Sequence, residues 1–158
     1  MQQTENQPEV QRLLDENARG LVLYARQWVA FAAEDIVQDA FCKLLDEKPF
    51  PKSPKAWLYR VVRNKSIDHV RREKRSNADS PRLDNWFRPS EEPIWDGEEI
   101  TRILAKLAPA VREIIVSKIW GGLTFREIAN LTNLSTSAVH KKYQQGIEQM
   151  RKEMKNEK

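Results

Sequence analysis

Three positions near the end of the chain restrict its local fold more than any other feature. Ala129 is small, Asn133 follows it by four residues, and Val139 follows Ala129 by ten. A helix-turn-helix needs a small residue where its helices cross, a turn residue that tolerates left-handed dihedral angles, and an apolar residue that returns the second helix to the core. The spacing therefore predicts a helix-turn-helix from Leu123 to Met150.

The surrounding residues predict how each helix of this motif begins and which face it exposes. Thr124 and Glu127 form a capping-box pattern, and Ser135 or Thr136 can cap the second helix. The inward residues of that helix recur at helical spacing: Val139, Tyr143, Ile147 and Met150. Polar side chains lie on or beside the other face: Ser137, His140, Lys141, Lys142 and Gln144. Such groups suit base edges and phosphates in a major groove, whereas the simpler alternative is a hairpin with a solvated polar face.

The rest of the sequence is typical of an all-α protein. Apolar residues recur at helical spacing, glycines number only 5, and no run alternates as a strand does. We expect helices at about residues 10–31, 33–45, 54–75, 98–108, 109–120, 124–132 and 136 to the end. Two apolar sets are expected to face the core: Ile36, Val37, Ala40, Phe41, Leu44 and Leu45 in one helix, and Trp57, Leu58, Val61 and Val62 in the next.

Charge divides the chain into two small helical domains. Residues 76–100 hold seven acidic and two basic side chains, together with Pro81, Pro89 and Pro93. Residues 60–75 hold seven basic and two acidic side chains. The expected organisation is a disordered tail at 1–8, a domain at 9–75, an extended acidic linker at 76–98 and a helix-turn-helix domain at 99–158.

Composition argues against several functional classes. One cysteine forms no internal disulfide, and Cys42 with His69 and His140 supplies too few ligands for a Cys/His zinc site. No nucleophile with its base, glycine-rich phosphate loop or metal cluster is recognisable, so we expect no enzyme activity, cofactor, metal or small-molecule substrate. No apolar run approaches the roughly 18 residues of a membrane span. The sequence predicts a cytoplasmic protein without membrane insertion.

Three segments resemble parts of bacterial RNA polymerase sigma factors. Residues 107–115 and 120–129 are similar to the C-terminal DNA-binding region of these proteins, called region 4. Residues 33–41 resemble the helix that docks on the clamp of core RNA polymerase, and residues 56–72 resemble the promoter-melting helix of region 2. Their order, with a variable linker and no third domain between them, is similar to the extracytoplasmic-function (ECF) class.

The resemblance implies partners and site residues. Core polymerase would meet one face of the helix at 33–45, made of Asp35, Gln38, Asp39 and Cys42, where Cys42 acts as a small hydrophobe. The downstream (−10) promoter element would be recognised and melted by Lys52, Ser53, Lys55, Arg60, Arg63, Asn64, Arg71 and Arg72. The upstream (−35) element would be read by Ser137, His140, Lys141, Lys142 and Gln144. An anti-sigma factor is a further partner that the resemblance allows.

Several alternatives stay open at this level. The N-terminal half of an activator or repressor would instead sense or dimerise, and a structural interaction protein would leave the helix-turn-helix spacing unexplained. The loop at 46–55 either forms a pocket for an extruded base or carries solvated lysines. Asn64 and Asp68 either bond to each other or to the loop, or contact DNA. In the linker, Trp86, Phe87 and Trp95 either anchor on polymerase or fold back on the two domains.

Overall fold

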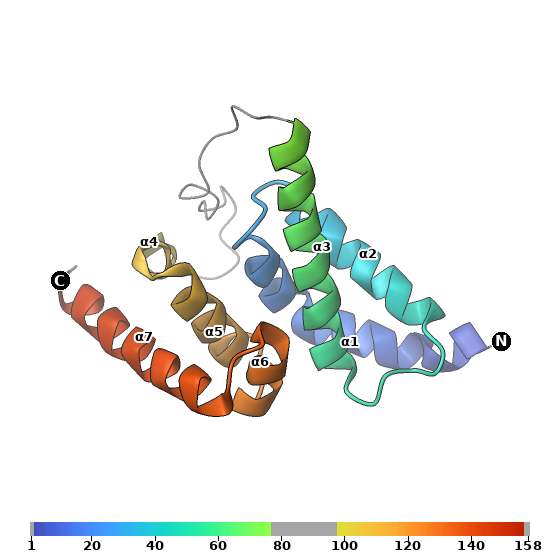
Figure 1. Cartoon of the computed structure of the whole chain (residues 1–158). Coiled ribbons are helices and arrows are strands. Elements are labelled where there is room, and N and C mark those ends of the chain that lie inside the picture. The colour runs from blue at the N-terminus through green and yellow to red at the C-terminus, as the bar shows by residue number, and fades with distance from the viewer. Residues whose placement is uncertain (1, 77–97, 157–158) are drawn as a thin grey trace. The chain divides into compact units, whose positions relative to one another are not determined.

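A computed structural model describes residues 2–76 and 98–156 of the chain. Within these ranges every regular element is an α-helix, which confirms the all-α prediction (Figure 1). The chain forms two compact units, Met1–Trp86 and Phe87–Lys158. The predicted acidic linker lies outside the described residues except for its two ends, and so do its aromatic residues Trp86, Phe87 and Trp95.

The N-terminal unit is a bundle in which each helix packs against the other two. Its helices are α1 (Gln2–Ala25), α2 (Ala33–Asp46) and α3 (Pro54–Ser76). Tyr24 and Tyr59 are fully buried, and their ring centroids lie 5.0 Å apart. Leu21, Leu44 and Leu58 are also fully buried. Since burying one such side chain stabilises a fold by roughly 1.5–3 kcal/mol, these apolar faces hold the three helices together.

Helix α1 begins and ends earlier than the sequence predicts. Residues 2–8, expected as a disordered tail, are helical, and the helix ends at Ala25 instead of Phe31. The early residues are mainly Gln and Glu, which are good helix formers although they give no apolar periodicity. The helix ends where i→i+3 hydrogen bonds from Gln27 and Trp28 tighten the turn, and the chain then buries Gln27 and Val29.

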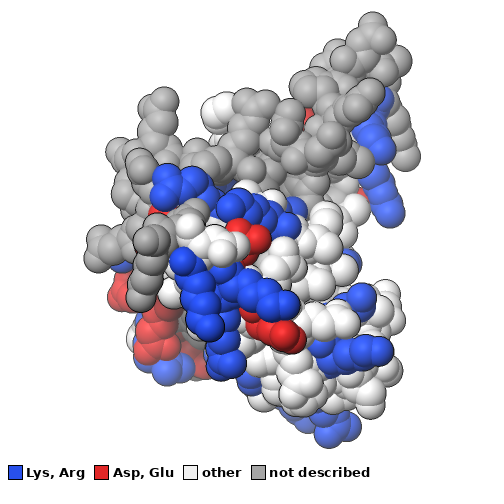
Figure 2. Space-filling view, turned by 90° about the vertical axis from the view of Figure 1, so that its left-hand side faces the viewer, with Lys and Arg blue, Asp and Glu red and all other residues white. Residues whose placement is uncertain are grey.

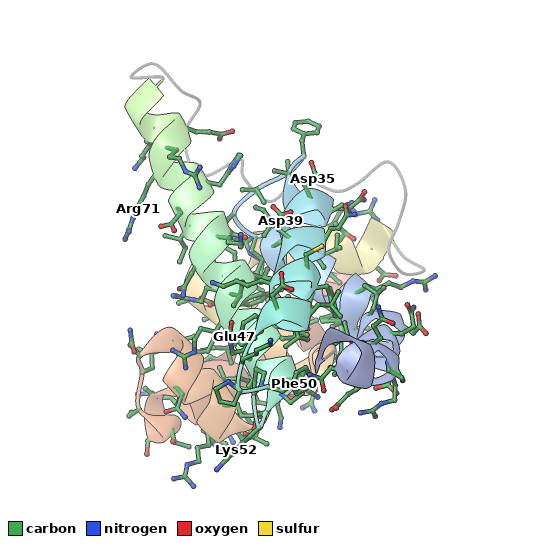
Figure 3. All side chains as sticks on the ribbon, turned by 90° about the vertical axis from the view of Figure 1, so that its right-hand side faces the viewer. Asp35, Asp39, Glu47, Phe50, Lys52 and Arg71 are labelled. Atoms are coloured by element: carbon green, nitrogen blue, oxygen red, sulfur yellow. The ribbon has the colours of Figure 1, made fainter. Side chains whose placement is uncertain are left out.

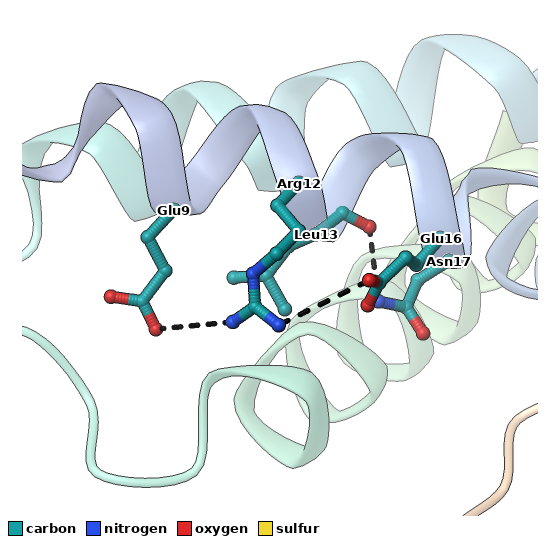
Figure 4. Close-up of polar contacts among 5 residues, drawn as sticks. All are labelled: Glu9, Arg12, Leu13, Glu16 and Asn17. Atoms are coloured by element: carbon teal, nitrogen blue, oxygen red, sulfur yellow. Dashed lines mark hydrogen bonds and ion pairs between the residues drawn. The ribbon is translucent and has the colours of Figure 1, made fainter.

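Short-range contacts on the exposed side of α1 support its length (Figure 4). Arg12 lies 3.9 Å from Glu9 and 4.0 Å from Glu16, one helical turn away on either side. The side-chain amide of Asn17 donates to the Leu13 carbonyl at 3.0 Å. Exposed pairs of this kind each stabilise a helix by about 0.2–0.5 kcal/mol, so they assist the helix while burial of its apolar face fixes its position.

The core face of α2 is confirmed, whereas that of α3 is rotated from the prediction. In α2 the predicted residues Ile36, Val37, Ala40, Phe41 and Leu44 are buried, and Leu45 is half-buried. In α3 the buried residues are Leu58, Tyr59, Val62 and Ser66, while the predicted Trp57 and Val61 are half-buried. The rotation follows from packing, because α3 meets α1 as well as α2 and Tyr59 reaches Tyr24 of α1.

The C-terminal unit is built around its last helix, which contacts each of the other three. The helices are α4 (Glu98–Lys106), α5 (Pro109–Ile119), α6 (Phe125–Thr132) and α7 (Thr136–Asn156). Ile103, Ile114, Ile115, Ile128 and Val139 are fully buried, so each helix contributes to one apolar core. Pro109 occupies the first turn of α5, as predicted from its fixed φ angle and missing N–H.

Arg112 joins α4 to α5 from inside the C-terminal unit. Its guanidinium donates to the carbonyls of Leu104 and Ala105 at 3.4 and 3.3 Å, at the end of α4. A cation stabilises a helix C-terminus because the last carbonyls lack intrahelical partners and carry partial negative charge. Burial lowers the pKa of Arg112 to about 10, so the side chain remains charged at neutral pH.

Candidate nucleic-acid and polymerase interfaces

The turn between α6 and α7 has the geometry that its sequence predicts. The Thr124 hydroxyl accepts from the Glu127 amide at 3.0 Å, and the Glu127 carboxylate accepts from the Thr124 amide at 2.9 Å. Asn133 adopts the left-handed conformation with φ 59°. The Ala138 amide donates to the Ser135 hydroxyl at 3.1 Å, which identifies Ser135 as the cap of α7. Both helices therefore start at positions fixed by local hydrogen bonds.

Helix α7 packs inward through Val139 and Gly146 and presents polar side chains on its outer face. Val139 is fully buried, and Gly146 lies so close to α5 that an added Cβ would fall 2.7 Å from Val111 Cγ1. Four of the predicted DNA-contacting residues are exposed: Ser137, His140, Lys141 and Gln144. At about 100° per residue, these four lie within one sector of the helix.

Lys142 departs from this sector. It is half-buried and is turned by about 100° from Lys141 around the helix axis. Four of the five predicted upstream-element residues thus share a face, while Lys142 borders it.

Figure 2, which views the molecule from the side on which α7 lies in Figure 1, shows Lys and Arg side chains spread over much of the described surface, with smaller groups of Asp and Glu between them.

Phe125, at the start of α6, contacts the outer face of α7 and was missed by the sequence interpretation. Its ring centroid lies 5.1 Å from that of His140 and 5.2 Å from that of Tyr143, edge-on in both cases. The ammonium group of Lys118, from α5, lies 4.4 Å from the Phe125 ring. Phe125 therefore supports His140 from within the unit. An aromatic residue directly after the N-cap of the first helix is the sequence signal that marks it.

The predicted acidic face of α2 is exposed along its length. Asp35, Gln38, Asp39 and Cys42 are all exposed, and Figure 3 shows Asp35 and Asp39 toward the end of α2 opposite to Glu47 and Phe50. Because the residues recur at three- and four-residue spacing, they form one stripe opposite the buried side of the helix. The stripe offers two carboxylates, an amide and a thiol to a partner.

An apolar groove adjoins this stripe and was not predicted. It encloses about 770 Å³ between α1 and α2, and Gln38 and Cys42 of the acidic face contribute to its lining. Two apolar series at four-residue spacing line it: Val10, Leu14, Ala18 and Val22 from α1, and Val37, Phe41 and Leu45 from α2. The spacing in α1 is visible in the sequence, but only the packing of α1 on α2 shows that the series face each other.

Helix α3 carries an exposed polar stripe opposite its buried face. Arg60, Asn64 and Arg71 are exposed and lie within about 40° of one another around the helix. Arg72 is exposed but turned by about 100° from Arg71. Arg63 is half-buried, with its guanidinium 5.8 Å from the Trp28 ring centroid. Asn64 and Asp68, both exposed, form no hydrogen bond with each other in the described structure.

The remaining residues predicted for the downstream element lie at the other end of α3. Lys52 and Ser53 are exposed in the loop before α3, and Lys55 is half-buried in its first turn. Figure 3 shows Lys52 and Arg71 near opposite ends of the helix. Lys55 and Arg71 are separated by roughly 25 Å at 1.5 Å per residue. The predicted residues therefore form an elongated series along α3 instead of one compact cluster.

Among residues 2–76 and 98–156, none of the helices combines the length and the apolar character that a membrane span requires. The same part of the chain contains no group of three or more His, Cys, Asp or Glu side chains arranged to hold a metal ion.

One helical unit ends in a helix-turn-helix, and the other carries a basic helix beside an exposed acidic one. This combination is typical of a DNA-binding transcription factor. The sigma-70 region 2 family matches residues 13–76, and the sigma-70 region 4 family matches residues 97–150. The chain belongs to the sigma-70 family of bacterial RNA polymerase sigma factors, in its extracytoplasmic-function class. It binds core RNA polymerase and promoter DNA and directs promoter-specific initiation of transcription; proteins of this family are initiation factors, not catalytic enzymes.

Individual relatives agree with this assignment. The ECF RNA polymerase sigma factor RpoE of Cereibacter sphaeroides is 25% identical over 138 residues, which cover 80% of this chain and 74% of the relative. RNA polymerase sigma factor SigV of Bacillus subtilis is 23% identical over 128 residues, covering 79% and 77%.

Solved structures show the same fold. The sigma factor RpoE, in complex with the anti-sigma factor NepR from Bartonella quintana, matches with a TM-score of 0.71 and 19% identity over 96% of this chain and 97% of that one. CnrH, in complex with the cytosolic domain of CnrY, matches with a TM-score of 0.61 and 23% identity over 99% and 94%.

Proposed function

We propose that the C-terminal unit reads the upstream (−35) promoter element through the outer face of α7. The observation that carries this proposal is the exposed sector of Ser137, His140, Lys141 and Gln144 at the start of a helix whose position is fixed by the capped turn. The first residues of such a helix meet base edges when it enters the major groove. Lys142, at the border of the sector, is placed to meet a backbone phosphate.

The N-terminal unit recognises and melts the downstream (−10) element in this proposal. Unstacking a base costs a few kcal/mol, and an opened strand needs contacts to its backbone along its length. Lys52 and Ser53 are exposed in the loop before α3, and Arg60, Asn64 and Arg71 are exposed along roughly 16 Å of the helix. Cations spread over such a length suit the phosphates of several successive nucleotides better than they suit one base.

The acidic stripe of α2 binds the clamp of core polymerase in the same proposal. Asp35 and Asp39 lie one helical turn apart and are exposed, so they are free to pair with basic groups of the partner. Gln38 and Cys42 connect the stripe to the apolar groove between α1 and α2, which adds apolar surface to the contact. An interface of this kind combines charge, which selects and orients the partner, with burial, which stabilises the complex.

An anti-sigma factor is a further proposed partner. Both solved structures described above are complexes, one with the anti-sigma factor NepR and the other with the cytosolic domain of CnrY. By analogy with the first complex, an anti-sigma factor binds this chain in our proposal. The test is capture of a protein that blocks binding to core polymerase.

Charge reversal on α2 tests the polymerase contact. The double substitution Asp35→Lys and Asp39→Lys should weaken binding to purified core polymerase by at least about tenfold, because like charges then face each other across the interface. The matched control is Asp15→Lys with Glu99→Lys, which changes the net charge equally at exposed positions outside α2. Equal losses in both double variants would show that overall charge, not the α2 stripe, governs binding.

Truncation on α7 tests promoter reading separately. His140→Ala with Lys141→Ala should lower the affinity of the reconstituted holoenzyme for upstream-element DNA by roughly 5- to 150-fold, since a good base contact contributes about 1–3 kcal/mol. Core binding should not change. Lys155→Ala, near the far end of α7, is the control. An unchanged affinity in the double variant would reject the assignment of this face.

A further inference from the structure

Phe31 is an exposed aromatic residue with no role in the N-terminal core. The residue belongs to the segment between α1 and α2 and is 93% exposed. The other large hydrophobic residues exposed within the described ranges, Ile119 and Met154, are 46% and 44% exposed. Single exposed apolar side chains are common on protein surfaces, so the exposure of Phe31 gains weight only from its place next to the first turn of α2.

The chain on both sides of Phe31 is fixed. Val29 and Ala33 are buried, at 4% and 1% exposed. The Val29 amide donates to the Ala25 carbonyl at 3.0 Å, and Arg26 bonds to Glu34 at 3.4 Å across the segment. Anchors thus hold the segment before and after the ring. A backbone held in this way loses little conformational freedom when a partner covers the ring, so the ordering cost falls mainly on the side chain itself.

The position of Phe31 connects it to the acidic stripe of α2. Phe31 lies two residues before α2 begins, and Asp35 lies within the first turn of that helix. We propose that Phe31 is the aromatic anchor with which the α2 stripe docks on core RNA polymerase. The partner surface it fits has an apolar pocket bordered by basic groups, because the ring needs a dry cavity and Asp35 and Asp39 need cations. This inference rests on the proposed role of α2.

Removal of the ring should weaken the polymerase complex and leave the free protein intact. Phe31→Ala should raise the dissociation constant for purified core polymerase about 10- to 30-fold, as expected for a buried aromatic anchor. Phe31→Trp should retain most of the affinity, because a larger ring still fills a pocket. The melting temperature should not change, since the ring contributes little to the core. Met154→Ala, which removes an exposed apolar side chain from the C-terminal unit, is the matched control and should bind normally.

The outcomes separate this inference from the proposal on which it rests. If Phe31→Ala binds core normally while the Asp35 and Asp39 double variant does not, the anchor is rejected and the α2 stripe is retained. If both bind normally, the α2 stripe itself is rejected. If sedimentation shows that the wild-type protein self-associates and Phe31→Ala does not, with polymerase affinity unchanged, the ring serves a contact between copies of this chain and the polymerase assignment is overturned.

Discussion

Gly146 permits the close approach of α7 to α5. An added Cβ would lie 2.7 Å from Val111 Cγ1 and 2.9 Å from Ile115 Cδ1, closer than carbon atoms pack. Alanine would gain about 1 kcal/mol of helix propensity, but overpacking of a core costs about 1–3 kcal/mol. We expect Gly146→Ala to destabilise the C-terminal unit by about 1 kcal/mol, measured by hydrogen exchange of α5 and α7 amides. Gln145→Ala, on the exposed side, should change stability by less than about 0.5 kcal/mol. A Gly146→Ala variant as stable as the wild type would show that the Val111 and Ile115 side chains shift enough to accommodate the methyl group.

Tyr59 should limit the stability of the N-terminal unit at high pH. Burial raises the pKa of its phenol, so the unfolded chain ionises near pH 10 while the folded chain does not. The unfolded state then holds fewer protons than the folded state, and stability falls as pH rises above about 10. Tyr59→Phe removes both this loss and an unpaired buried hydroxyl.

We therefore expect Tyr59→Phe to equal or exceed the wild type by up to about 1 kcal/mol at pH 7, with an advantage that grows above pH 10. Urea unfolding followed by circular dichroism at pH 7 and above pH 10 measures both values. A variant less stable than the wild type at pH 7 would show that the hydroxyl has a stabilising partner.

Residues whose role is local were predictable from the sequence. The capping pair Thr124 and Glu127 and the left-handed Asn133 follow from side-chain chemistry within a few residues, and the structure confirms them. Gly146 and Tyr59 were not identified, because a close approach or a ring contact depends on which helix packs opposite. Phe31 was missed for the same reason: only the folded chain shows that it is exposed.

At the scale of elements, the capping box should contribute measurably to the start of α6. Thr124→Ala removes the acceptor for the Glu127 amide, and loss of an N-cap costs typically about 1 kcal/mol. We expect the melting transition of the C-terminal unit to fall by a few degrees. Thr124→Ser, which keeps the hydroxyl, should restore most of the stability. Equal melting temperatures for the wild type and Thr124→Ala would mean that packing alone fixes this end of α6.

The helices themselves were predictable to different degrees. Helix α2 and the helices of the C-terminal unit carry apolar stripes, and their positions agree with the sequence to within a few residues. The bounds of helix α1 were not predictable, because its first residues have helix propensity without periodicity and its end depends on burial of Gln27 and Val29. The position of the loop before α3 was predictable from its prolines, but the shape of the loop was not.

At the scale of the whole molecule, one initiation factor contains a region 2 unit and a region 4 unit. Family membership shows that the chain acts with core polymerase at promoters, whereas the division of the two promoter elements between α7 and α3 stays a prediction. The sequence predicts the faces that this division requires. It did not locate the groove between α1 and α2, since that surface exists only when two distant apolar series meet.

Transcription in vitro, with purified core polymerase and a library of promoter fragments, tests the central claim most directly. The wild-type chain should copurify with core and direct initiation from a subset of fragments that share an upstream and a downstream element. Changes in the upstream element should alter the response of the wild type but have little further effect on the His140 and Lys141 double variant. Failure to copurify with core, or initiation no greater than that of core alone on every fragment, would contradict the account.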